Sequence, residues 1–291
     1  MTAIPAKMAG VKKIIISTPP RHGNIDPLVL AAAKIADVDQ VFQVGGAQAI
    51  AAMTYGTQTI PKVEIVCGPG NIFVTLAKKM VFGEVGVDGL FGPTETLIIA
   101  DEHANIAHCT ADLLAQAEHD PLATPILITT SKKLSDTVNS NILEQSKKIT
   151  RSNIAQASLK NNGLIILVED INQAIELSNI FAPEHLSLML NKPEKHLDQI
   201  ANVGIIFSGK SAHEVIGDYI AGPSHVMPTN QTAKFNSGIN ILTFMKIIPI
   251  VNLDNLSTQK LKELNEIAYT LAMSEGFDAH ANAAESRLDS L

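Results

Sequence analysis

Two polar side chains in the segment from Leu113 to Pro121 are of types that bind metal ions. Gln116 and His119 are three residues apart in a stretch with helical character, so they share one face of a helix that Pro121 prevents from continuing far. A carboxamide oxygen is a weak ligand, and such a site needs stronger partners elsewhere. An exposed helix surface or a hydrogen-bonded core histidine is the alternative that this spacing leaves open.

A carboxylate and an imidazole are adjacent at Glu184 and His185, directly after Pro183. The proline predicts the opening of a helix at this point. Such a pair can divide water activation and proton transfer between its two members. The alternative is a helix N-terminus with a favourable acidic residue and no chemistry.

Two later segments carry further candidate ligands. Asp218 and His225 lie in a segment punctuated by Gly217, Gly222 and Pro223, which predicts a loop, and loops on a rigid scaffold often carry binding residues. Asp218 is either an anionic ligand or an Asx-turn residue. His280 follows the end of the last expected helix, and its spacing alone indicates little.

Two glycine-rich turns, at 45–48 and 68–71, each follow an expected strand and open an expected helix. Phosphate groups bind free backbone N–H groups at such positions. Neither turn has the G-x-G-x-x-G pattern, and an ordinary tight turn would also use glycine for its unusual φ. The amides Gln48 and Asn71 favour the binding interpretation.

Composition narrows the range of partners. The chain has 291 residues, 46% of them hydrophobic, and a formal net charge of -7, without a basic run. This excludes nucleic acid and anionic membranes as expected partners and favours small molecules. The longest apolar runs have strand length, too short to span a membrane. Cys67 and Cys109 have no paired spacing, so we expect a reducing compartment, the cytoplasm.

Short β-branched runs alternate with helical patterns, which predicts the α/β class with a mostly parallel sheet. The expected strands are at 11–20, 41–44, 63–67, 96–100, 125–129, 163–168 and 204–207, and the expected helices include 27–36, 47–52, 71–82 and 257–274. The polar stretch 132–160 is helix-friendly and is expected to be a solvated surface excursion.

Taken together, these segments resemble the histidinol dehydrogenase family. The motifs occur in the family's order: Gly-Gly-Ala-Gln at 45–48, Gly-Pro-Gly-Asn at 68–71, Gly-Pro-Thr-Glu at 92–95, the Gln116–His119 segment, Ala-Pro-Glu-His-Leu at 182–186, Gly-Asp-Tyr at 217–219 and Ala-His at 279–280. The resemblance implies an enzyme of histidine biosynthesis that uses zinc and NAD. It would oxidise L-histidinol through L-histidinal to L-histidine with two NAD.

The resemblance also implies a role for each matching residue. One zinc per subunit would be held by Gln116, His119 and Asp218, with His280 supplied by the other subunit of a homodimer through a swapped C-terminal arm. Glu184 would activate water and His185 would be the general base. The substrate would contact Thr94, where serine is usual, Gln116, His119, His185, Asp218, Glu275 and His280, and NAD would contact Gln48 and Asn71.

The implied organisation is two Rossmann-like domains, both incomplete, and an exchanged helical arm. Residues 1–93 would form the NAD-contacting domain, 94–237 the domain with the zinc and catalytic residues, lacking its usual N-terminal half, and 238–291 the dimerisation arm. Family members carry further chain before the position of Met1, so an N-terminally incomplete member is expected. The alternatives are an inactive remnant that only binds zinc or nucleotide or pairs with a separate N-terminal chain, and a dehydrogenase for another amino alcohol.

Overall fold

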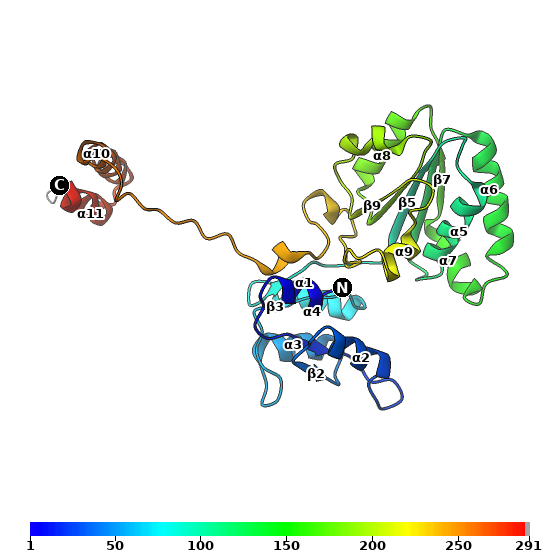
Figure 1. Cartoon of the computed structure of the whole chain (residues 1–291), viewed down its shortest axis with the longest axis horizontal. Helices are drawn as coiled ribbons and strands as arrows, with labels where there is room; N and C mark the ends of the chain where they lie inside the picture. Colours follow the sequence, from blue (N-terminus) through cyan, green and yellow to red (C-terminus); the bar gives the residue numbers. More distant parts are fainter. Residues whose placement is uncertain (289–291) are drawn as a thin grey trace. The chain divides into compact units, whose positions relative to one another are not determined.

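The computed structural model describes residues 1–288 and divides into two compact units (Figure 1). The first unit is Met1–Met245 and the second begins at Lys246. Each unit is described by itself. Among the described residues, no helix is long and apolar enough to cross a membrane.

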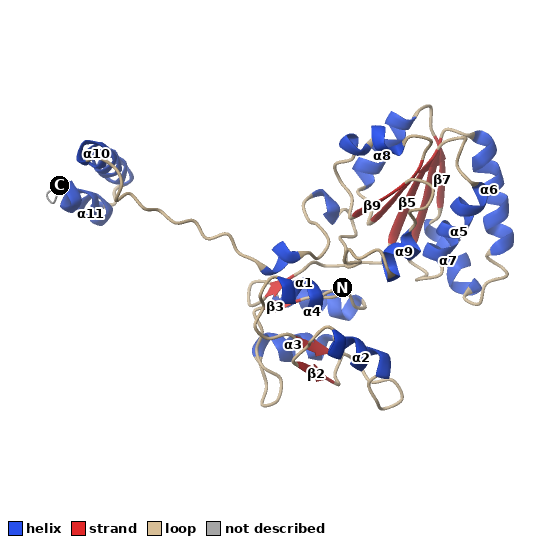
Figure 2. Cartoon of the chain, in the orientation of Figure 1, coloured by secondary structure: helices blue, strands red, loops and turns tan. Residues whose placement is uncertain are grey.

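A five-stranded parallel sheet forms the larger part of the first unit, with strand order β7-β6-β5-β8-β9. The strands are β5 (Glu95–Ala100), β6 (Thr124–Thr129), β7 (Leu164–Leu167), β8 (His185–Met189) and β9 (Ile205–Ser208). Its helices are α5 (Ile106–Ala117), α6 (Lys132–Gln145), α7 (Ser152–Asn162), α8 (Ile171–Phe181) and the short α9 (Glu214–Tyr219). They lie on both sides of the sheet (Figure 2). Every residue of β5 is buried, as expected for a central strand covered on both faces.

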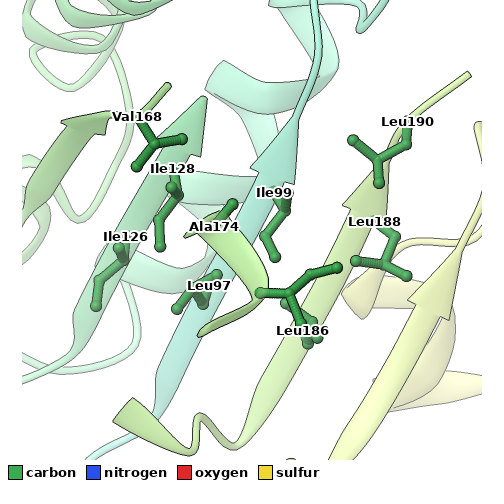
Figure 3. Packing of buried hydrophobic residues seen from close by; sticks show 10 residues of the cluster. Leu97, Ile99, Ile126, Ile128, Val168, Ala174, Leu186, Leu188 and Leu190 are labelled. Carbon is green, nitrogen blue, oxygen red and sulfur yellow. The ribbon is translucent and has the colours of Figure 1, made fainter. Parts of the chain in front are cut away.

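Alternate residues of β5 supply two hydrophobic cores, one on each face of the sheet. Leu97 and Ile99 pack with Ala174 of α8 and with Leu186 and Leu188 of β8 (Figure 3). On the opposite face, Ile98 and Ala100 pack with side chains of α5 and α6, namely Cys109, Leu113, Leu134, Val138 and Ile142. This period of two explains how one apolar run covers both faces.

The smaller part of the first unit contains two two-stranded parallel sheets, β1-β2 and β3-β4. Its elements are α1 (Ala3–Met8), β1 (Ile15–Ser17), α2 (Pro27–Ile35), β2 (Gln40–Phe42), α3 (Ala47–Tyr55), β3 (Ile65–Val66), α4 (Ile72–Val81) and β4 (Gly86–Val87). The predicted α/β class is confirmed, although the strand expected over 11–20 has only three residues because it pairs with β2 alone.

The segment after α9 returns to the smaller part of the unit. It contains the 3-10 helices η3 (Thr232–Lys234) and η4 (Ile241–Phe244), while η1 (Pro193–Lys195) and η2 (Leu197–Gln199) lie between β8 and β9. Val226 and Ile239 pack against Phe91 in a small core. The backbone N–H of Gly92 also donates to the hydroxyl of Thr229. The segment is therefore anchored to the chain that enters β5.

The predicted helix at Glu184 and His185 is wrong, because His185 opens strand β8. Ala182 ends α8 in the left-handed conformation, with φ of 56°, and Pro183 and Glu184 connect it to the strand. Residues 185–189 then pair with β5 on one side and with β9 on the other. Backbone pairing with two neighbours outweighs the local signal of a proline followed by an acid.

Two further expectations are corrected. Residues 132–160 form the helices α6 and α7, in agreement with their helix-friendly composition, but they are more than a solvated excursion because α6 buries Leu134, Val138 and Ile142 against the sheet. Asp218 belongs to helix α9, where a loop was expected. Both errors arise because the apolar positions that anchor these helices are few and are recognisable only once the sheet is present.

The second unit is a helical hairpin of α10 (Thr258–Glu275) and α11 (Asp278–Leu288). The predicted tail helix is confirmed, and Gly276 ends it in the left-handed conformation with φ of 76°. The N–H of Phe277 donates to the carbonyl of Ala272, which completes a Schellman-type end. The second helix, α11, was not expected from the sequence.

Candidate active site

The candidate site lies at the edge of the five-stranded sheet where β5 and β8 begin. Thr94 precedes β5, and Glu184 and His185 lie at the start of β8. Gln116 is in the last turn of α5, which returns from the opposite edge of the sheet, and Asp218 is in α9. Thr96 of β5 pairs with His185 of β8, so the parallel register brings these chain segments together.

The Thr94 hydroxyl joins two of the candidate residues. The Nε2 of Gln116 donates to Thr94 Oγ1 at 2.5 Å, and Thr94 Oγ1 donates to Glu184 Oε2 at 2.8 Å. Gln116 is fully buried, and its Oε1 has no hydrogen-bond partner. An unpaired buried carbonyl oxygen is costly unless a cation or donor approaches it. The hydroxyl thus orients the amide so that its oxygen is available as a ligand.

Glu184 is held in a site that favours its protonated form. Burial raises the pKa of this carboxyl to about 8, although hydrogen bonds from Thr94 and from the backbone N–H of Glu95 partly oppose the rise. The N–H of Glu95 lies 3.2 Å from Glu184 Oε2. A carboxyl with this pKa exchanges protons near neutral pH, which suits general acid–base work.

His185 is a neutral imidazole whose tautomer is set by its surroundings. Its Nδ1 lies 3.0 Å from the carbonyl oxygen of Glu95, so Nδ1 carries the hydrogen and donates it. Burial, followed by the nearby His225, lowers the pKa of His185 to about 3. Its Nε2 is therefore unprotonated at neutral pH, and it faces the Nε2 of His225.

His225 is part of the site, although within its Gly- and Pro-rich segment only Asp218 was predicted to have a specific role. Its Nε2 lies 2.8 Å from His185 Nε2 and 2.7 Å from Asp218 Oδ1, and the two imidazole rings stack with centroids 4.6 Å apart. Burial acts to raise the pKa of Asp218, but the hydrogen bond and charge of His225 lower it overall. The signal that could have found His225 is its place in the Gly- and Pro-rich segment that begins with Asp218.

Glu214 was not predicted from the sequence, and it lies beside the predicted ligands His119 and Asp218. Ligand atoms of His119, Glu214 and Asp218 all lie within 4.8 Å of one another. Glu214 is buried with a hydrogen bond from the Thr96 hydroxyl, and burial raises its pKa well above the ordinary value. This oxygen and nitrogen set, with the unpaired Gln116 Oε1 on the same helix that leads to His119, fits zinc.

A second overlapping group is formed by His185, Glu214 and His225. Their ligand atoms also lie within 4.8 Å of one another among the described residues. In this group the Nδ1 of His185 already donates to the carbonyl oxygen of Glu95. His185 is therefore better suited to act as a base than as a metal ligand.

The other sequence-predicted residues belong to other elements of the chain. Gln48 is an exposed residue of the first turn of α3, and Asn71 caps α4 by accepting from the N–H groups of Phe73 and Val74. Glu275 and His280 are exposed residues of the second unit, on either side of Gly276. Their roles stay predictions.

The raised pKa of Glu184 predicts a pH-dependent stability that Glu184→Gln removes. Its contribution to folding is complete below the ordinary value of 4.5 and is lost as pH rises through about 8. The free energy of unfolding of the wild type, minus that of E184Q, should therefore fall over this range. Urea denaturation at several pH values, with a metal chelator present, measures it.

The matched control is Glu144→Gln on the exposed face of α6. Lys148 lowers the pKa of Glu144 through a hydrogen bond, so any slope from this carboxyl has the opposite sign. A wild-type minus E184Q difference that stays flat from acidic to alkaline pH contradicts the burial argument.

The chain is similar in sequence to proteins of one known family. The family model for histidinol dehydrogenase matches residues 1–288. Histidinol dehydrogenase of Dehalococcoides mccartyi is 53% identical over 290 residues, covering 99% of this chain and 66% of that protein. Histidinol dehydrogenase of Prochlorococcus marinus is 48% identical, covering 99% of this chain and 65% of that protein. The chain thus spans just under two thirds of the length of these relatives.

Solved structures agree with the sequence comparison. The crystal structure of histidinol dehydrogenase from Elizabethkingia anophelis superposes with a TM-score of 0.93 at 36% identity, covering 99% of this chain and 66% of that one. An acetylating aldehyde dehydrogenase from Geobacillus thermoglucosidasius has a TM-score of 0.52 at 12% identity, covering 87% of this chain and 73% of that one, which shows a likeness of fold alone.

Proposed function

Because the chain belongs to the histidinol dehydrogenase family, we propose that it carries out the zinc-dependent oxidation of L-histidinol to L-histidine with two NAD. The observation that carries the proposal is the neutral His185, whose Nδ1–H is held by Glu95 while its unprotonated Nε2 faces the Nε2 of His225 at 2.8 Å, beside the ligand cluster. An alcohol oxidation requires a base to accept the hydroxyl proton.

We propose Gln116, His119 and Asp218 as zinc ligands, with His280 of the partner subunit as the fourth. The unpaired Gln116 Oε1 and the close approach of His119 to Asp218 support this set. When bound, zinc supplies an electrophilic centre that orients the imidazole and amine of the substrate. Thr94 and Glu275 complete the proposed substrate contacts, Glu275 through the attraction of its carboxylate for the amine.

The chain's own residues can account for the proton movements of both oxidation steps. In the first, His185 Nε2 accepts the hydroxyl proton of L-histidinol while hydride leaves the carbinol carbon for NAD, which yields L-histidinal. In the second, the carboxylate form of Glu184, which is populated as the pH approaches about 8, takes a proton from water as the oxygen adds to the aldehyde, and His185 returns its proton to the aldehyde oxygen to complete the hydrate. His185 then accepts a hydroxyl proton of the hydrate, and a second hydride leaves for NAD to give the carboxylic acid, which ionises to the carboxylate.

The proposed domain division is 1–93, 94–237 and 238–291, with Gln48 and Asn71 as NAD contacts in the first part. It is supported by the distribution of the sheets, since the two small sheets precede residue 93 and the five-stranded sheet lies within 95–208. We also propose that the protein works in the cytoplasm, where a biosynthetic enzyme meets free NAD and its two cysteines stay reduced.

Replacing His185 and His119 one at a time distinguishes the proposed general base from a proposed zinc ligand. His185→Asn should slow NADH formation by about a hundredfold to ten-thousandfold, the usual contribution of a general base, and should retain zinc. His119→Asn should lose zinc, because it removes a ligand from the cluster. Elemental analysis of the purified variants and the rate of NADH formation with L-histidinol measure the two effects.

The control is His103→Asn, an exposed histidine outside the site, which should change neither quantity. Equal zinc loss in the His185 and His119 variants would contradict the separation of base from ligand. A wild-type chain that binds zinc but never reduces NAD would instead favour the binding-only alternative.

Thr94 allows the orientation of Gln116 to be tested. Thr94→Val removes the hydroxyl that accepts from Gln116 and donates to Glu184, so the amide loses its fixed orientation. Zinc affinity should fall about tenfold to a hundredfold, as is usual when the partner of a metal ligand is removed. Competition with a chromogenic chelator measures it. Thr94→Ser, which keeps the hydroxyl, is the matched control and should bind zinc like the wild type.

The exchanged arm predicts complementation between inactive variants. If His280 serves the partner's site, a mixed dimer of His119→Asn and His280→Asn chains has one complete site and one that lacks both ligands. After unfolding and refolding of an equal mixture, activity should return to about a quarter of the wild-type level, since half of the dimers are mixed and half of their sites are complete. Each variant refolded alone is the control. An inactive mixture that contains mixed dimers would show that His280 serves its own chain.

A further inference from the structure

A buried ion pair lies beneath the glycine-rich loop at 68–71. Lys78 of α4 and Asp88, which follows β4, form a salt bridge with side chains that are 2% and 0% exposed. Neither residue belongs to the cluster described above. Their burial raises the question of what this pair contributes.

Both charges bind the same residue, Gly68. The N–H of Gly68 donates to Asp88 Oδ2 at 2.7 Å, and Lys78 Nζ donates to the carbonyl oxygen of Gly68 at 3.0 Å. Lys78 Nζ also donates to Asp88 Oδ1. The two side chains therefore satisfy both backbone polar groups of the first residue of the loop.

The loop has little other support at this point. Strands β3 and β4 pair over only two residues each, a length that is marginal for a stable sheet. Gly68 has φ of 113°, which a side chain would strain, and an added Cβ would meet no heavy atom within 4 Å. Its backbone is therefore held by Lys78 and Asp88 on one side and is open on the other.

The ion pair also links the loop to the helix that the loop opens. Lys78 lies in α4, whose N-cap is Asn71. At Gly70, an added Cβ would lie 2.6 Å from Val74 in the first turn, so the loop packs closely on the helix. The Nζ of Lys78 additionally lies 4.8 Å from the centre of the Phe91 ring, a cation–π distance.

A contribution to the free energy of unfolding does not by itself explain the buried pair of Lys78 and Asp88. A buried ion pair is often no more stabilising than an apolar pair of similar volume, because both charges lose their hydration. An apolar pair, however, could not hold the N–H and the C=O of Gly68 in fixed directions. The charged pair therefore contributes orientation, which an apolar pair cannot supply.

We propose that Lys78 and Asp88 are positioning residues that hold the backbone of the loop at 68–71 in the conformation that receives the dinucleotide cofactor. The proposal rests on the proposed function for its ligand, NAD. The loop conformation itself can be measured without the ligand. Neither residue contacts the cofactor in this proposal, since each acts through Gly68.

The test replaces the pair with apolar residues in the double variant K78M/D88L of the full chain. The single variant D88N, which keeps the shape of the side chain, is measured beside it. D88N should lower the melting temperature because it leaves Lys78 buried without a full counter-charge, and the double variant should recover much of that loss. The pair K132M/D136L, which removes an exposed ion pair of α6, is the matched control.

Hydrogen–deuterium exchange and steady-state kinetics are then measured on each variant. Hydrogen–deuterium exchange of the peptide over residues 67–73 should be about tenfold faster in D88N and in K78M/D88L, as expected for the loss of a hydrogen bond, and unchanged in β5. The KM for NAD should rise about tenfold by the same reasoning, with kcat and the KM for L-histidinol nearly constant. The control should match the wild type in the exchange rate and in every kinetic constant.

The outcomes separate this inference from the proposed function. A double variant with recovered melting temperature and wild-type exchange over 67–73 would overturn the positioning role. Faster exchange with an unchanged KM for NAD would overturn its link to the cofactor. A wild-type chain that reduces no NAD and binds none by calorimetry would overturn the NAD assignment of the loop, and the inference with it.

Discussion

The candidate site depends on the parallel pairing of β5 with β8. The register that places Thr96 opposite His185 also brings Glu95 beside both candidate catalytic residues. The backbone N–H of Glu95 then donates to Glu184, and its carbonyl accepts from His185. A shift of one residue would turn these side chains to the other face of the sheet and break both hydrogen bonds. The hydrophobic cores on the two faces hold that register, so the packing of the sheet and the chemistry of its edge are linked.

Burial at this edge of the sheet shifts the pKa values of two neighbouring side chains in opposite directions. It raises the pKa of Glu184 to about 8 and lowers the pKa of His185 to about 3, because it disfavours the charged form of each. Adjacent residues of one strand end are thus kept neutral over much of the physiological range. A pair of this kind can exchange protons with substrate and water without carrying a large fixed charge.

Much of the fold could be predicted from local sequence. Long apolar runs marked β5, β6 and β7. The side chains of Asn71 and Asn105 accept from N–H groups in the first turns of α4 and α5, a local role that suits asparagine but was not predicted for either residue. Strand β8 could not be predicted, because five residues after a proline are too short a signal against a helix start. The structure resolves the ambiguity by pairing the segment on both sides.

The α/β class, the family and the types of residue available for chemistry can be inferred from the amino-acid sequence, since they follow from periodicity and from motifs that are local in the chain. The folded chain was needed to show that Thr94 bridges Gln116 and Glu184, that His225 stacks on His185, and that Glu214 joins His119 and Asp218. These contacts join residues that are distant in the chain. Burial then shifts the pKa values of the titratable residues among them, such as Glu184 and His185. Register, burial and orientation are properties of packing, which no single segment contains.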